Sequence, residues 1–239
     1  MKNVINLNNL SGLPAEFLAE LDRFRNLFLN DMFLDSLLEN RSILSIVRAI
    51  DTYCMDNQLI GFHYTRAFEH EISSSGLVCR TGLEIRNAFL DNHISAFSEG
   101  EIANIKKTWD NHFDLSQQKS RDARLYFNFT TTALNNGGAD PLLSSYGGEQ
   151  VYMPFNEIQL IDKKLKSIGT PMIIKCMLDP NHLNTFWEFP WGRIAVSTYH
   201  CQVNRDAIRN DQDGYQFVNV SAENIEILHF DTKIDYDNI

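Results

Sequence analysis

The chain has 239 residues, of which 44% are hydrophobic and 22% charged, and its formal net charge at pH 7 is −10. This composition is ordinary for a globular protein with a sizeable core, and the acidic balance argues against a stable nucleic-acid binding module, which gains affinity by neutralising phosphates. No apolar run is long enough to span a bilayer, and the four cysteines lack metal-type or CxxC spacing, so we expect a cytoplasmic protein with reduced thiols and no membrane partner.

The first quarter of the chain is predicted to be helical. Residues 13–53 have apolar side chains at helical spacing, the clearest being Phe17, Leu21, Phe24 and Phe28. A break is expected at Asn40 or Arg41, which gives two or three amphipathic helices. We expect this N-terminal helical layer, residues 1–58, to pack on the core, and a partner-binding role stays open.

Residues 59–77 (LIGFHYTRAFEHEISSSGL) change from a strand pattern to a helix pattern. Ile60, Phe62 and Tyr64 alternate with Gly61, His63 and Thr65, so His63 and Thr65 are predicted to share one strand face. From Arg66 onward the alternation is lost, and a short helix is expected to end at the glycine after three serines. Alone, a histidine on a strand face is more often structural than a ligand.

The middle of the chain combines a helix, a polar stretch and an aromatic strand. Ser98 and Glu101 form a candidate capping box for a helix that contains Ile102, Ile105 and Trp109. Residues 115–122 (LSQQKSRD) are predicted to be a polar loop. Residues 124–132 (RLYFNFTTT) are aromatic and β-branched, which is typical of a buried strand.

The remaining elements are predicted to be mostly strands. A short helix is expected at 141–145, a turn that enters a strand at 146–154, and strands at 171–178, 194–200, 215–220 and 225–230. The last two strands are predicted to form a hairpin-like pair around 221–224. Helices in the first half and short strands in the second half favour an α+β fold, which we interpret as a single domain, 1–239.

Several motifs with known chemistry are absent from the sequence. It has no GxGxxG after a strand, no GxxxxGK[ST], no GxSxG and no HExxH. Its histidines and cysteines are not grouped at metal-ligand spacing, so no metal is expected. No local pattern singles out one cysteine as a nucleophile, although cysteine–histidine catalysis is not excluded.

Three segments together resemble a known family. HYTRAFEHEISSSGL resembles the first motif of NAD-dependent ADP-ribosyltransferases, in the branch of toxins that modify nucleic acids. RLYFNFTTT is similar to the second motif of this family, and YGGEQVY resembles the third. The order of the three segments along the chain also agrees with the family.

The resemblance implies a fold, a substrate and a set of site residues. The fold would be ADP-ribosyltransferase-like, with split mixed or antiparallel sheets, and NAD would be the substrate. His63 and Thr65 would contact the ribose and nicotinamide side of NAD, and Tyr126 would pack on the nicotinamide ring. Glu149, at the start of a strand, would be the catalytic carboxylate. Arg80 is a weaker candidate for a pyrophosphate contact, since a surface role is more common for such an arginine.

The chemistry of the reaction agrees with these residue types. Cleavage of the nicotinamide–ribose bond builds positive charge on the sugar, which a fixed carboxylate stabilises. Two glycines before Glu149 would let the backbone turn sharply. Arginine-specific family members carry Glu or Gln two positions before the catalytic Glu, where this chain has Gly147, so an acceptor other than arginine is favoured.

The resemblance therefore predicts a mono-ADP-ribosyltransferase that modifies a macromolecule. RNA or DNA is the acceptor of the branch that the first motif resembles, in a toxin or phage-defence role for which an antitoxin would be a partner. A protein acceptor stays open because the chain is acidic, and an NAD glycohydrolase would use the same site with water as acceptor. The alternative from another class is an inactive interaction protein that binds partners through its N-terminal helices.

Overall fold

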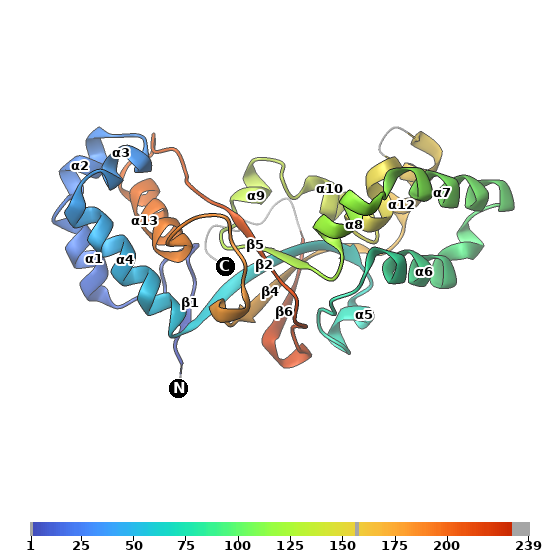
Figure 1. Cartoon of the computed structure of the whole chain (residues 1–239), viewed down its shortest axis with the longest axis horizontal. Coiled ribbons are helices and arrows are strands. Elements are labelled where there is room, and N and C mark those ends of the chain that lie inside the picture. The colour runs from blue at the N-terminus through green and yellow to red at the C-terminus, as the bar shows by residue number, and fades with distance from the viewer. Residues whose placement is uncertain (1, 156–157, 231–239) are drawn as a thin grey trace.

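A sheet lies between two groups of helices in this protein (Figure 1). The structure is a computed structural model that describes residues 2–155 and 158–230, so the first and last residues of the expected domain lie outside the described part. Within that part helices and a largely antiparallel sheet form an α+β fold, as the sequence predicted. None of the described helices has both the length and the apolar character needed to cross a bilayer.

The described strands form one six-stranded sheet in the order β5-β3-β2-β4-β6, with β1 parallel to β2. Their bounds are β1 Val4–Ile5, β2 Gln58–Ala67, β3 Leu125–Asn128, β4 Thr170–Leu178, β5 Asp213–Gln216 and β6 Ile225–His229. All neighbours along the main path are antiparallel.

The central strand β2 is paired very unequally on its two sides. Against β4 it pairs continuously from Leu59 to Ala67, but its register with β3 is the single pair Phe62↔Asn128. Beyond that pair the two strands diverge, so a fork separates residues 63–67 from residues 125–127. The expected split into separate sheets is therefore wrong for the described strands, which make one sheet with a fork in it.

The N-terminal helices pack at one end of the sheet, as predicted. They are α1 Ala15–Asp22, α2 Arg25–Asn30, α3 Leu34–Leu38 and α4 Arg41–Met55. The predicted break before α4 is confirmed, because the Asn40 side chain accepts hydrogen bonds from the backbone N–H groups of Ser42 and Ile43.

A helix from the C-terminal half completes this layer. The segment 194–200, predicted to be a strand, lies inside α13 Pro190–Val203, which packs against α4. That prediction was wrong because residues 194–200 are buried on every side, so their sequence shows no polar face from which a helical period could be recognised.

A second group of helices lies at the other end of the sheet, around a separate core that contains Trp109 (Figure 1). It comprises α5 Glu69–Ser73, α6 Gly82–His93, η1 Ile94–Ala96, α7 Glu99–His112, α8 Leu115–Arg121, α11 Glu149–Tyr152, η2 Met153–Phe155 and α12 Gln159–Ser167. The Ser98–Glu101 capping box at the start of α7 is confirmed. The short helix expected after Arg66 is α5, and Gly76 follows it with φ +69°.

Shorter elements complete the fold. The helix predicted at 141–145 is α10 Asp140–Ser144, which packs with Ile60, Phe62 and Tyr64 of β2. The others are α9 Thr132–Asn135, η3 Pro180–His182 and η4 Ala222–Asn224.

Three other sequence predictions were wrong. The polar stretch 115–122 contains α8, a helix whose N-terminus is capped by the Asp114 carboxylate. Segment 146–154 contains the short helices α11 and η2 where a strand was expected. The two C-terminal strands do not form a hairpin, because β5 pairs with β3 and β6 pairs with β4 at opposite edges of the sheet.

Candidate active site

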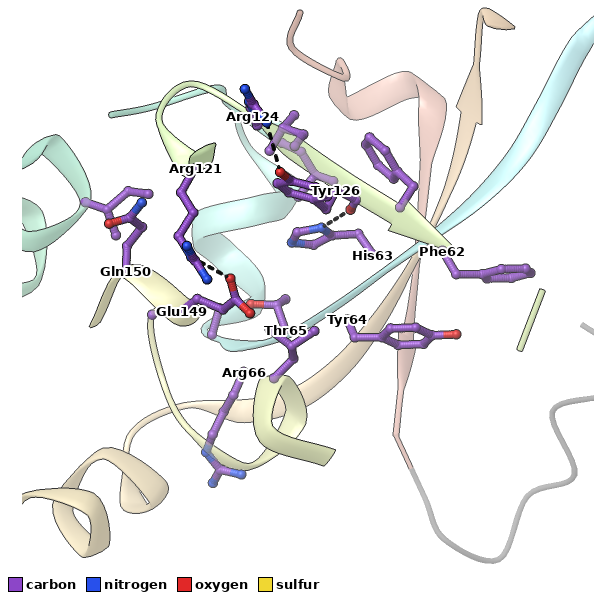
Figure 2. A pocket seen from close by; sticks show the side chains of 18 of the residues that line it. Phe62, His63, Tyr64, Thr65, Arg66, Arg121, Arg124, Tyr126, Glu149 and Gln150 are labelled. Carbon is purple, nitrogen blue, oxygen red and sulfur yellow. Dashed lines mark hydrogen bonds and ion pairs between the residues drawn. The ribbon is translucent and has the colours of Figure 1, made fainter. Parts of the chain in front are cut away.

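A cavity of about 1180 Å³ lies at the fork between β2 and β3. The five residues that the sequence singles out all line it: His63, Thr65, Arg80, Tyr126 and Glu149. Its volume is slightly above the usual range of about 300–1,000 Å³ for small-molecule sites, so it has room for a ligand of dinucleotide size. Residues far apart in the chain thus meet at one cavity, and Figure 2 shows their arrangement.

His63 is held by the backbone of the opposite strand. Its Nδ1 lies 2.9 Å from the carbonyl oxygen of Tyr126, and because a carbonyl only accepts, Nδ1 carries the proton and donates it. Nε2 is then the acceptor nitrogen of the ring. Burial lowers the pKa of His63, so the imidazole is neutral at pH 7. The site therefore contains a fixed, neutral hydrogen-bond acceptor at this position.

Thr65 lies two residues further along β2, on the same strand face as His63. Phe62 and Tyr64 point away from His63 toward the other side of the sheet (Figure 2), where they pack in an apolar cluster. The alternation predicted for this strand is thus confirmed.

Tyr126 has a fixed ring at the edge of the cavity. Its hydroxyl donates to the carbonyl oxygen of Ser120 at 3.0 Å and accepts from Nη1 of Arg124 at 3.3 Å. Its ring centroid lies 5.3 Å from that of Tyr215. Contacts at both ends hold this ring in one orientation, which suits the packing of a flat ligand group.

Glu149 begins the short helix α11, so its predicted position at the start of a strand was wrong. The sharp glycine turn before it is confirmed: Gly147 and Gly148 have φ of +84° and +66°. A left-handed residue pair reverses the chain direction and allows Gly148 to serve as the N-cap of a helix. The glycine turn is therefore followed by helical turns, α11 and η2.

The carboxylate of Glu149 is paired with Arg121 from the end of α8. Arg121 Nε donates to Glu149 Oε2 at 3.1 Å, as drawn in Figure 2. The Glu149 side chain is 45% exposed and that of Arg121 is 21% exposed, so the carboxylate remains accessible from the cavity. Sequence reasoning missed Arg121 because it assigned 115–122 to a loop.

Hydrogen bonds from α6 and α7 hold the turn that carries Glu149. The buried Gln150 accepts a hydrogen bond from Arg86 Nη1 at 2.8 Å, and Trp109 Nε1 donates to the Val151 carbonyl at 3.0 Å. A Cβ atom on Gly82 would lie 2.1 Å from the Gln150 side-chain oxygen, so only glycine leaves room for this contact. These contacts fix the residues that follow Glu149 and so help to orient its side chain.

Both cations and carboxylates line the cavity. Its arginines are Arg66, Arg80, Arg121 and Arg124, and its carboxylates are Glu71, Glu149, Asp211 and Asp213. The Arg66 Nε donates to the carbonyl of Ile168 at 2.8 Å, while Arg80 is exposed at the rim. The basic cluster at 119–124, just before the aromatic strand, is the signal that could have indicated these arginines in the sequence.

One carboxylate of the cavity was also missed by sequence reasoning. Asp211 accepts a hydrogen bond from the hydroxyl of Thr130, and burial raises the pKa of Asp211. It follows α13 in a segment without regular structure, where no periodic pattern marks it.

The structure also bears on metal and thiol chemistry. Over residues 2–155 and 158–230 no group of three or more His, Cys, Asp or Glu side chains is placed to hold a metal ion. The four cysteines are free, and burial raises the pKa of each thiol. These thiols are therefore poor nucleophiles at neutral pH, because the thiolate is the reactive form.

Comparison of the chain with protein-family models, with curated proteins and with solved structures finds no match.

Proposed function

We propose that this protein is an NAD-dependent mono-ADP-ribosyltransferase that binds NAD in the cavity at the fork and transfers ADP-ribose to a macromolecule. The observation that carries the proposal is the convergence on one cavity of five residues, four from three short motifs and Arg80 from just after the first motif. These residues span as many as 86 positions of the sequence, from His63 to Glu149 (149 − 63 = 86). Residues so far apart would rarely line one cavity by chance. The fold class, α+β, is compatible with the proposal.

In this proposal Glu149 is the catalytic carboxylate. When the nicotinamide–ribose bond breaks, its electron pair leaves with the nicotinamide and positive charge develops on the ribose. Glu149 accepts a hydrogen bond from a ribose hydroxyl and stabilises that charge, and the ion pair with Arg121 orients the carboxylate in the free enzyme. The acceptor nucleophile then forms the new bond to the ribose carbon.

The other cavity residues bind and orient NAD. The neutral Nε2 of His63 accepts from a second ribose hydroxyl, and the fixed Tyr126 ring packs on the nicotinamide. Arg80 and Arg121 supply guanidinium groups for the pyrophosphate, since planar guanidinium matches phosphate oxygens. Thr65 supplies a hydroxyl beside His63 on the same strand face.

Labelled NAD tests the proposal directly. The purified protein is incubated with NAD labelled in its adenylate half and with cell extract, which is then separated into nucleic-acid and protein fractions. We expect release of nicotinamide and transfer of label to a macromolecular fraction. Free labelled ADP-ribose without macromolecular label would indicate an NAD glycohydrolase. Absence of nicotinamide release in every mixture would overturn the proposal in favour of an inactive interaction protein.

A role as a toxin or phage-defence effector is part of the same proposal. Expression of the wild-type chain in a bacterial host is expected to arrest growth, and the Glu149→Gln variant is expected to be tolerated. A Glu39→Gln variant, which changes an exposed carboxylate in the N-terminal helices, is the matched control. An arrest by both the wild-type chain and Glu149→Gln would contradict a toxic role for the catalytic activity.

A further inference from the structure

An exposed strip of aromatic side chains adjoins the cavity at the β5 edge of the sheet. We call it the aromatic ribbon, and it consists of Arg124, Tyr126, Phe186, Tyr215 and Phe217. The register pairs Tyr126 of β3 with Tyr215 of β5, so both point to the same face of the sheet. Side chains two positions away, at Arg124 and Phe217, share that face.

The ribbon is continuous from ring to ring. The centroid of Tyr215 lies 5.3 Å from that of Tyr126, 5.4 Å from that of Phe217 and 6.3 Å from that of Phe186. The guanidinium carbon of Arg124 lies over two of the rings, 4.3 Å from the Tyr215 centroid and 5.7 Å from the Phe217 centroid. These are distances at which aromatic rings and a cation attract one another.

The outer rings of the ribbon are open to solvent. Phe186 is 65% exposed and Phe217 is 54% exposed, whereas Gly214 and Gln216, on the opposite face of β5, are buried. Single exposed aromatic residues are common, but a connected row with an arginine across it is the kind of surface that binds flat ligand groups.

The ribbon leads into the cavity. Arg124, Tyr126 and Phe186 line the cavity as well as belonging to the ribbon. A molecule that lies on the ribbon therefore reaches the same space as His63 and Glu149. If NAD binds in the cavity as proposed above, a molecule on the ribbon lies where an acceptor of ADP-ribose has to lie.

We propose that the aromatic ribbon binds unpaired nucleobases, so that the acceptor of this enzyme is single-stranded nucleic acid. The inference rests on the proposed function and names its substrate class. Every base has a flat π face that stacks on Tyr or Phe, and each such stack contributes about 1–3 kcal/mol of binding free energy. The guanidinium of Arg124 can stack on a base or contact a phosphate while it stays over Tyr215.

The local charges indicate which part of the nucleic acid is recognised. Lys119 and Arg124 are basic, but Asp213 begins β5, Asp211 lies two residues before it, and the whole chain has a net charge of −10. Phosphate contacts are therefore few, and stacking on bases supplies most of the affinity. We expect binding with a shallow salt dependence, unlike that of a basic nucleic-acid binding module.

Binding of oligonucleotides in the absence of NAD tests this inference. Fluorescein-labelled single-stranded RNA and DNA of about ten nucleotides are titrated with the full chain, and fluorescence anisotropy reports the Kd. A duplex of the same sequence is the comparison, because its bases are already stacked on each other. We expect the single strands to bind more tightly than the duplex, and the difference between RNA and DNA shows which acceptor is preferred.

Variants of the exposed rings give the sharpest outcome. Phe217→Ala and Phe186→Ala are each expected to raise the Kd for the single strand by about tenfold, the loss of one stacked base. Phe33→Ala removes a ring of similar exposure, 53%, from the N-terminal helices and is expected to leave the Kd unchanged. Both ribbon residues are exposed, so the variants are expected to fold, which circular dichroism checks.

Two results would overturn the inference. One is equal binding of the oligonucleotides by wild type and by both ribbon variants, and the other is transfer of NAD label to protein alone. Nicotinamide release by the wild-type chain without any oligonucleotide is measured separately. A chain that binds single strands through the ribbon but releases no nicotinamide would contradict the proposed transferase while leaving the nucleobase surface intact.

Discussion

The two sides of the cavity are held in place by different means. The strand side, His63 and Thr65 on β2, is paired with β4 along its whole length and fastened to β3 through the Tyr126 carbonyl. The turn side, residues 147–152 with Glu149, depends on two left-handed glycines, one ion pair and the bracing of Gln150. A paired strand resists displacement, whereas a short turn can adjust when a ligand enters. The proposed binding residues His63 and Thr65 therefore lie on the rigid strand side, and the carboxylate of Glu149 lies on the adaptable turn side.

The largest effect is expected from Glu149→Gln, which removes the negative charge from the turn side and keeps its shape. We expect nicotinamide release to fall by about 100-fold or more, as for the loss of one preorganised electrostatic contact in other enzymes. Because the side chain is 45% exposed, the free energy of unfolding should change little. Steady-state rates measure nicotinamide release and urea unfolding measures the free energy of unfolding, with Glu39→Gln as the control for both. Full activity in Glu149→Gln would rule out the assigned role.

The glycine turn is tested by a pair of variants. Gly147→Ala is expected to cost about 2–4 kcal/mol, since its φ of +84° strains an alanine and the new Cβ would lie 2.6 Å from the Val151 side chain. Gly148→Ala meets no atom within 4 Å, so it carries only the backbone strain of φ +66° and ψ −175°, about 1–3 kcal/mol.

Urea unfolding at neutral pH measures both variants. Gly100→Ala, in the first turn of α7 with open space around it, is the control and is expected to be neutral or to stabilise the protein by up to about 1 kcal/mol. Equal stability of Gly147→Ala and the wild type would show that the turn before Glu149 is not confined to these dihedral angles.

Breaking the ion pair on the turn side is expected to have a smaller effect. Arg121→Gln removes the partner of Glu149 and one cation of the cavity. We expect the KM for NAD to rise by about tenfold, the effect of one lost charged hydrogen bond, and stability to change by less than about 1 kcal/mol because the pair is partly exposed. Initial rates over a range of NAD concentrations separate KM from kcat. A Lys119→Gln variant, which removes an exposed cation of the same helix, is the control.

On the strand side, the buried His63 is expected to make the free energy of unfolding depend slightly on pH. Burial lowers the pKa of His63, so below the unfolded-state pKa of about 6.5 the unfolded chain binds a proton that the folded chain does not. Stability is therefore fully present above that pH and declines as the pH falls toward the folded-state pKa. His63→Asn keeps a side-chain N–H donor for the Tyr126 carbonyl and removes the titration.

Urea unfolding at about pH 7.5 and about pH 5.5 measures this difference. We expect the variant to lose less stability on acidification than the wild type, by up to about 1.4 kcal/mol, because pH 5.5 lies about one unit below the unfolded-state pKa of histidine. Part of the loss remains in the variant, because burial also lowers the pKa of His93. An identical loss in variant and wild type would mean that His63 is not held neutral by its surroundings.

The sequence predicts local elements well and their partners poorly. Periodic apolar residues indicate the N-terminal helices and the β2 and β4 strands, and the spacing of Ser98 and Glu101 indicates the start of α7, because these signals come from neighbouring positions. Residues 194–200 were misassigned because uniform burial removes the period. The pairing of β5 with β3, and of β6 with β4, depends on contacts far apart in the chain, which no local pattern contains.

In the candidate site, too, residues marked by local motifs could be predicted, and residues that depend on contacts between distant parts of the chain could not. Glu149, His63 and Tyr126 could be selected from short motifs, and the left-handed glycines from the GG pair. Arg121 could not, because its importance comes from the ion pair that α8 makes with a segment 28 positions later in the chain. The aromatic ribbon likewise exists only because β3 and β5 become neighbours, although their residues lie about ninety positions apart (215 − 126 = 89).

The packing of α13 against α4 has a consequence for how the chain acquires its shape during synthesis. Trp191 and Gly192 donate backbone hydrogen bonds to Asp51, and a Cβ on Gly192 would lie 2.0 Å from the Val47 carbonyl oxygen, so the two helices meet backbone to backbone. The N-terminal helices leave the ribosome long before residue 203 is made, with their apolar face uncovered until α13 arrives. Contacts of such long sequence separation slow folding. A nascent chain that ends before α13 should therefore be protease-sensitive throughout its N-terminal quarter, and become resistant only once α13 is free to dock.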